Sequence, residues 1–147
     1  MNPDTIVLVQ RSWHCVQPNA GSAAAIFYAR LFALDPALES LFRGDMVTQG
    51  EKLMRMIGTA VSRLDDLPAL VPVLQSLGQR HGGYGVKPAH YAVVGAALLG
   101  TLHEALGEAF DTRTRSAWEA VYGLIADTMI AAAAAGAGHS APATLTA

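Results

Sequence analysis

Cysteine is almost absent from this chain, and its scarcity excludes several kinds of site at once. Cys15 is the single cysteine among 147 residues. The chain can therefore form no internal disulfide and no cysteine-cluster metal site, and it lacks the Cys-x-x-Cys-His sequence that attaches a prosthetic group covalently. No local pattern marks Cys15 as a nucleophile, so we expect it to be a buried or half-buried structural thiol.

Charged residues are also scarce, at 15% of the chain, and they are scattered. The net charge is −2, and nothing resembles the basic stripe of a nucleic-acid-binding protein or the polybasic patch of a membrane-surface protein. The longest uncharged stretch inside the chain, residues 88–103, is shorter than the roughly 20 residues that span a bilayer. The first four residues include no basic side chain, so we expect no signal peptide and a cytoplasmic location.

No stretch alternates apolar and polar residues as a half-buried strand does, whereas apolar residues recur with helical spacing almost throughout. We therefore predict an all-α protein with one domain over residues 1–135 and a disordered tail over residues 136–147. A mostly polar connector is expected at residues 43–48. The expected helices are 6–16, a segment around 26–32, a short helix at 37–42 after an Asp35-Pro36 cap, 49–64, 67–81, 88–102 and 112–129.

One stripe of residues stands out on the segment that precedes residue 82. Leu70, Leu74, Leu77 and His81 recur at the spacing of one helix face. A glycine-rich stretch at residues 82–85 then ends the helix, so His81 can offer a ring nitrogen to the interior. A hydrogen-bonded core histidine is the alternative interpretation. The other histidines that we interpret as structural or surface residues are His14, His90 and His103.

The helix before this one supplies polar groups of its own. Gln49 precedes Leu53 by one turn on the same face. Two such helices packed as a V would enclose an apolar slot, with His81 on one wall and Gln49 and Leu53 on the other. Phe42 could close one end, and Tyr28 could reach in from the second helix. An apolar slot with a few convergent polar groups is the usual form of a cofactor site.

The ordered set of segments resembles the globin family over about residues 5–130. Within that family the chain looks like a single-domain bacterial haemoglobin, similar to neuroglobin and to the haem domain of flavohaemoglobins. The resemblance implies the globin fold, a 3-over-3 helical sandwich around one non-covalently bound haem b. The segments that carry it are Phe27-Tyr28-Ala29-Arg30-Leu31-Phe32, residues 36–42, Leu77-Gly78-Gln79-Arg80-His81 with Tyr84-Gly85-Val86, His90-Tyr91 with Val94-Gly95, and Ala117-Trp118 with Tyr122-Gly123.

The resemblance also implies roles for single residues. His81 matches the proximal histidine that binds the haem iron, and Phe42 matches the phenylalanine that stacks on the porphyrin. On the distal side, Tyr28 and Gln49 match polar residues that face the ligand, and Leu53 matches an apolar gate. By themselves, Tyr28, Phe42 and Leu53 are equally consistent with core packing, and Gln49 with a solvated residue at a helix start.

Other residues are implied as lesser contacts of the haem. Lys52 could reach a haem propionate, although a solvated lysine explains it as well. The remaining residues that the resemblance places against the haem are Leu77, Val86, Tyr91 and Val94.

A tyrosine hydroxyl and a glutamine amide would stabilise O2 as it takes up negative charge at ferrous haem. We therefore expect reversible binding of O2, CO and NO at a penta- or weakly hexacoordinate iron, for storage, scavenging or delivery of oxygen. The alternatives are an enzyme, either a nitric oxide dioxygenase or a nitrite reductase, and a haem-based gas sensor. The sensor is disfavoured because no output domain or coiled coil follows the last helix.

One departure from the family disfavours the enzyme. Flavohaemoglobin-type domains usually place a glutamate in the last helix, where it hydrogen-bonds the proximal histidine. In this chain that position falls near Ala133, inside a run of five alanines, and a proximal imidazole without such a carboxylate is less anionic. The chain also lacks a GxGxxG motif, so an enzyme would require a separate reductase.

Overall fold

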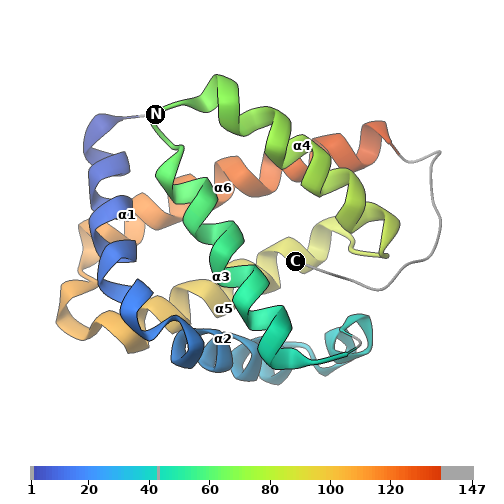
Figure 1. Ribbon diagram of the computed structural model, residues 1–147, viewed down its shortest axis with the longest axis horizontal. Coiled ribbons are helices and arrows are strands. Elements are labelled where there is room, and N and C mark those ends of the chain that lie inside the picture. The colour runs from blue at the N-terminus through green and yellow to red at the C-terminus, as the bar shows by residue number, and fades with distance from the viewer. Residues whose placement is uncertain (1, 43, 137–147) are drawn as a thin grey trace.

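Helices make up the regular structure of residues 2–42 and 44–136, the part of the chain that the computed structural model describes (Figure 1). No residue in those ranges lies in a strand, which confirms the all-α prediction. Of the predicted tail, residues 137–147 lie outside the described residues. The α-helices are α1 (Pro3–Val16), α2 (Ala20–Leu34), α3 (Met46–Ser62), α4 (Leu67–Gly83), α5 (Pro88–Leu106) and α6 (Thr112–Ala135), and the 3-10 helices are η1 (Gln17–Asn19), η2 (Pro36–Leu41) and η3 (Gly107–Ala109).

Short polar side chains fix where four of these elements begin. Asn2, Asp35, Asp45 and Asp111 precede α1, η2, α3 and α6. Each side chain accepts a hydrogen bond from a backbone N–H of the first turn, at 2.8–3.2 Å. These bonds satisfy N–H groups that have no partner within the helix.

Asp45 explains why the predicted connector at residues 43–48 is wrong. The carboxylate of Asp45 accepts both the Val47 N–H and the Thr48 hydroxyl, so α3 begins at Met46 instead of Gln49. The Thr48 hydroxyl and then the Val47 N–H lower the pKa of Asp45. The sequence-based prediction gave weight to the polar character of the segment and missed the cap.

Of two other predictions about local structure, the structure refines one and shows that the other is wrong. The segment expected as a short helix at residues 37–42 is the 3-10 helix η2, the tighter form that proteins use in short pieces. Cys15 is exposed instead of buried. The buried face of α1 contains Val9, Trp13 and Val16, and at about 100° per residue Cys15 points away from that face.

Helices that are far apart in the sequence pack across one another. In Figure 1, α3 and α4 diverge as a V in front of α5 and α6. The contacts behind this view join α4 to α6, α1 to α6 and α2 to both α3 and α5. None of the described helices is long and apolar enough to cross a membrane.

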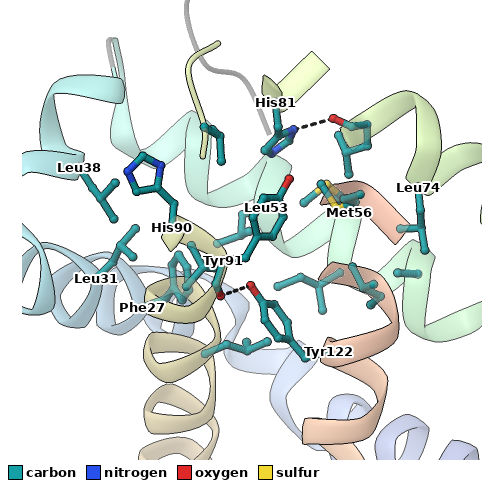
Figure 2. Close-up of a pocket in the computed structure, with 18 of the residues that line it drawn as sticks. Phe27, Leu31, Leu38, Leu53, Met56, Leu74, His81, His90, Tyr91 and Tyr122 are labelled. Atoms are coloured by element: carbon teal, nitrogen blue, oxygen red, sulfur yellow. Dashed lines mark hydrogen bonds between the residues drawn. The ribbon is translucent and has the colours of Figure 1, made fainter. Parts of the chain in front are cut away.

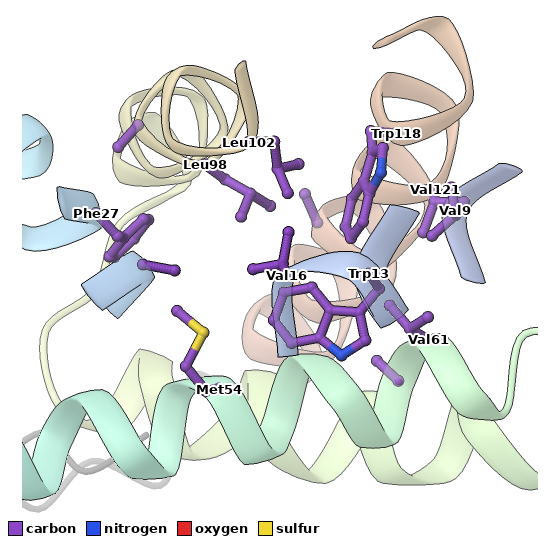
Figure 3. Packing of buried hydrophobic residues seen from close by; sticks show 14 of the residues in the cluster. Val9, Trp13, Val16, Phe27, Met54, Val61, Leu98, Leu102, Trp118 and Val121 are labelled. Carbon is purple, nitrogen blue, oxygen red and sulfur yellow. The ribbon is translucent and has the colours of Figure 1, made fainter. Parts of the chain in front are cut away.

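A buried hydrogen bond ties α1 to α6 inside the apolar core. The Trp118 indole N–H, whose ring Figure 3 shows near Trp13, donates to the Ser12 hydroxyl oxygen at 2.8 Å. That hydroxyl donates to the Leu8 carbonyl at 2.7 Å. The Trp13 ring lies against the Trp118 ring, with 6.1 Å between the centroids. Because Trp118 also lines the cavity described below, this bond holds one cavity wall in place.

Ser12→Ala should therefore leave a buried indole N–H without an acceptor. We expect the free energy of unfolding to fall by about 1–3 kcal/mol, as measured by chemical denaturation. Ser62→Ala is the matched control, because its hydroxyl also bonds a helix carbonyl, that of Thr59 at 2.9 Å, but at an exposed position. Equal losses in the two variants would contradict the role of the Trp118–Ser12 bond.

Candidate cofactor-binding site

An interior cavity of about 160 Å³ offers more than ten times the space that a single water molecule needs, ~10–15 Å³. Its walls come from α2, η2, α3, α4, α5 and α6. Leucine, isoleucine, valine, methionine and phenylalanine side chains make up most of the lining. The lining residues with a hydroxyl or an imidazole are Tyr28, His81, His90, Tyr91 and Tyr122.

His81 projects from the last turns of α4 into this cavity (Figure 2). Its Nδ1 lies 2.9 Å from the Leu77 carbonyl oxygen. Because a carbonyl only accepts, Nδ1 carries the proton and Nε2 keeps a lone pair in the neutral ring. Burial lowers the pKa of His81, and the Arg80 charge adds to this effect, whereas the bond to Leu77 opposes it. The neutral ring with a free Nε2 is the form that binds a metal.

The chain turns sharply after His81 and returns to the cavity. The Tyr84 N–H donates to the Arg80 and His81 carbonyls, and the Val86 N–H donates to the His81 carbonyl at 3.0 Å. Gly85 has a φ of +94°, which glycine adopts without strain. As a result Val86 lines the cavity next to the histidine that precedes it by five residues.

Two glycines let α4 approach α6 closely and so set the position of His81. A Cβ added to Gly78 would lie 2.6 Å from the Met129 Cα, so only glycine fits there. A Cβ added to Gly82 would lie 3.0 Å from the Ala133 Cβ. Ala133, where the family resemblance leads one to expect a carboxylate, therefore packs against the turn of α4 that contains His81.

The residues expected on the distal side are brought together, but not all of them line the cavity. The Tyr28 hydroxyl donates to the Gln49 backbone carbonyl at 3.4 Å, and burial raises the pKa of Tyr28 to about 12. Phe42 meets the Tyr28 ring edge-on, with 5.4 Å between the centroids. Tyr28, Phe42 and Leu53 line the cavity. Gln49 is 4% exposed, but it is not among the lining residues, and neither is Lys52.

The four lesser contacts implied by the resemblance, Leu77, Val86, Tyr91 and Val94, all line the cavity. The Tyr91 hydroxyl is buried with no hydrogen-bond partner among the described residues. The backbone carbonyl of Tyr91 accepts a hydrogen bond from the Tyr122 hydroxyl at 2.6 Å. Burial raises the pKa of Tyr122, and the Tyr91 charge adds to this effect.

Sequence reasoning missed several lining residues. His90 was interpreted as structural or surface, and it is structural in one sense, because its Nδ1 accepts the Lys87 N–H at 2.9 Å at the start of α5. Its ring nevertheless lines the cavity. Its adjacency to Tyr91 was the only signal that could have found it. The apolar residues that were missed include Leu38, Leu41, Met56, Ile57, Ile125 and Met129.

These features fit haem better than a bare metal ion. Among the described residues, no three His, Cys, Asp or Glu side chains lie together as ligands. An iron held by His81 would therefore take most of its ligands from a macrocycle. The apolar walls suit such a flat hydrocarbon ring, the neutral imidazole of His81 suits an axial ligand, and the unpartnered Tyr91 hydroxyl belongs to the same lining.

An apolar cavity with one neutral histidine in its lining suits a helical protein that holds a planar metal macrocycle. This chain belongs to the globin family, whose sequence pattern matches residues 25–129. Membership of that family implies that the protein binds haem and diatomic gases such as O2. It also confirms the predicted globin fold.

Individual relatives agree with this assignment. The chain is 36% identical to a neuroglobin of Tetraodon nigroviridis and 35% identical to one of Danio rerio, and each alignment covers 83% of this chain and 86% of the relative. A bacterial globin from Campylobacter jejuni superposes with a TM-score of 0.81 at 25% identity, over 94% of this chain and 100% of that one. An engineered carbene transferase from Rhodothermus marinus superposes with a TM-score of 0.84 at 24% identity, over 94% and 96%.

Gly78→Ala should push α4 away from α6, because its methyl group would overlap the Met129 backbone. We expect a loss of at least about 1–3 kcal/mol in the free energy of unfolding, the usual cost of overpacking, and faster loss of haem. Gly83→Ala on the same helix is the control, since a Cβ there has no atom within 4 Å. A Gly78→Ala protein as stable as Gly83→Ala in chemical denaturation would refute this account.

Proposed function

We propose that this protein binds O2 and other diatomic gases reversibly at a non-covalently held haem b, with His81 as the proximal ligand of a penta- or weakly hexacoordinate iron. When bound, haem supplies an iron atom that takes up a diatomic gas. The observation that carries the proposal is the His81–Leu77 hydrogen bond of 2.9 Å. It fixes the imidazole tautomer and points the remaining lone pair into an apolar cavity.

The residues around His81 have the properties that this function requires. Phe42, Leu53, Leu77, Val86 and Val94 surround the cavity with hydrocarbon, which would hold the porphyrin and exclude water from its iron. The attachment is proposed to be non-covalent because the single cysteine is exposed on α1 and lacks the attachment sequence. We retain Lys52 as a proposed partner of a haem propionate, although it is absent from the lining.

Tyr28 and Gln49 are proposed as the distal donors. The Tyr28 hydroxyl donates to a backbone carbonyl at 3.4 Å, which is long for an O–H donor. A gas ligand with partial negative charge would be a stronger acceptor, so the hydroxyl would turn toward it. The Gln49 backbone carbonyl lies at this hydroxyl and its side chain is buried, and we propose that the amide turns toward the same ligand.

Nitric oxide dioxygenase or nitrite reductase activity with a separate reductase stays the second candidate, and a haem-based gas sensor the third. The contact at Ala133 favours reversible binding over the enzymes. A methyl group packs against Gly82 at this position, and it provides no carboxylate to draw the proton of His81 toward it. The Nδ1 proton of His81 is bonded instead to the neutral Leu77 carbonyl, which raises ligand basicity less than a carboxylate does.

The first test of the proposal is the requirement for His81. We expect the purified wild-type protein to bind one haem that acid ketone extraction removes, and His81→Ala to lose most of it. His103→Ala is the control, because His103 is exposed and outside the cavity lining. Absorption spectra of the ferric, deoxy, oxy and CO forms report the result. Stoichiometric haem with unchanged CO spectra in His81→Ala would overturn the assignment of the ligand.

The second test concerns the distal donors. Tyr28→Phe removes a hydroxyl that we expect to donate to a charged acceptor, a bond worth roughly 1.5–3 kcal/mol. At ~1.4 kcal/mol per tenfold, O2 should leave roughly 10- to 100-fold faster in stopped-flow measurements. CO carries little charge on its outer atom, so CO release is the internal control and should change much less.

Gln49→Leu should act in the same direction as Tyr28→Phe. If the two donors share one network, the double variant should fall short of the summed effects. O2 dissociation that is unaltered in Tyr28→Phe would instead make Tyr28 a core residue only.

A further inference from the structure

His90 occupies two environments at once. It is the third residue of α5 (Pro88–Leu106), and its ring lines the cavity while remaining half-exposed. Figure 2 places it on the same side of the cavity as Leu31 and Leu38, with Leu74 on the opposite side. Phe42, Leu53 and His81 are half-exposed lining residues as well, so His90 is one of the residues at which the cavity lining meets the protein surface.

The start of α5 determines which nitrogen of His90 carries the proton. The Lys87 backbone N–H donates to His90 Nδ1 at 2.9 Å. Because Nδ1 accepts this bond, the ring proton of neutral His90 is on Nε2. The cap at the start of the helix thus leaves His90 with an N–H group where the cavity lining meets the protein surface.

The other side-chain donors of the cavity lining either already donate to a protein carbonyl or lie away from solvent. Tyr28 donates to the Gln49 carbonyl, Tyr122 to the Tyr91 carbonyl, and His81 Nδ1 to the Leu77 carbonyl. The Tyr91 hydroxyl has no described partner, but it is buried. Among the described lining residues, His90 is therefore the only one whose side-chain donor is both uncommitted and near solvent.

We propose that His90 Nε2–H donates a hydrogen bond to a propionate carboxylate of the bound haem. This inference rests on the proposed haem-binding function. The periphery of haem b is hydrocarbon except for two carboxylates, and burial of an unpaired carboxylate is costly. The carboxylates would therefore lie where the cavity lining meets solvent, and among the half-exposed lining residues there His90 offers an uncommitted donor. A charged acceptor makes such a bond stronger than one between neutral groups.

Two variants separate the donor from the helix cap. In both His90→Glu and His90→Gln, a side-chain oxygen can still accept the Lys87 N–H, since Glu and Gln serve in this way at the third position of helices. Gln also retains an N–H donor, whereas Glu presents a negative charge. The variants are matched in size and differ mainly in the group that would face a propionate.

The experiment measures haem dissociation from each protein to an excess of a scavenger apoprotein, first with protohaem and then with its dimethyl ester. The ester retains the iron and the macrocycle but removes both carboxylate charges. With protohaem we expect His90→Glu to lose haem about tenfold faster than wild type, which corresponds to ~1.4 kcal/mol. His90→Gln should stay close to wild type. With the ester, the three rates should converge.

A His90→Glu effect of equal size with both forms of haem would overturn the proposal, because it would reflect packing or the cap instead of a carboxylate. No effect with protohaem would overturn it as well. Lys52→Met in the same assay tests the alternative partner, and an ester-sensitive loss there alone would transfer the role to Lys52. If wild-type protein bound neither form of haem, the proposed function itself would fail, which is a distinct result.

Discussion

The close approach of α4 to α6 at Gly78 is the constraint on which the site depends. The Gly78 position leaves no room for a side chain because the Met129 backbone occupies it. One turn later on α4, His81 is held by the Leu77 carbonyl and enters the cavity. Met129 also lines that cavity, so the same contact fixes both the ligand helix and part of the wall. The imidazole is thus positioned by rigid helix packing, which places a ligand more reproducibly than a loop does.

Much of the fold could be predicted from the sequence because its helices are amphipathic. The stripe of Leu70, Leu74 and Leu77 is buried as its spacing indicates, and the globin resemblance supplied the arrangement of the helices. The start of α3 was not predicted, because one aspartate cap outweighs a run of polar residues. The prediction for Cys15 was wrong because cysteine as a residue type is usually buried, whereas the position of Cys15 around the axis of α1 decides which way its side chain points.

The candidate site was less predictable than the fold. Helix spacing and the globin resemblance together placed His81, Tyr28, Phe42 and Leu53 at one cavity, yet they could not show that Gln49 is buried outside the lining. His90 was overlooked because the sequence shows only a histidine near a proline. That pattern is the same whether the histidine caps a helix, lines a cavity or does both. Such dual roles depend on where the ring points, and that direction is a property of tertiary packing.

The two tryptophans of the chain give this protein an optical property that follows from their packing. Trp118 lines the cavity, and the Trp13 ring lies 6.1 Å from it. Both indoles are buried, and a porphyrin held in the cavity would lie against Trp118. Energy transfer to the porphyrin would then lower the emission of Trp118. The intrinsic fluorescence of the unmodified protein therefore distinguishes its empty from its loaded form.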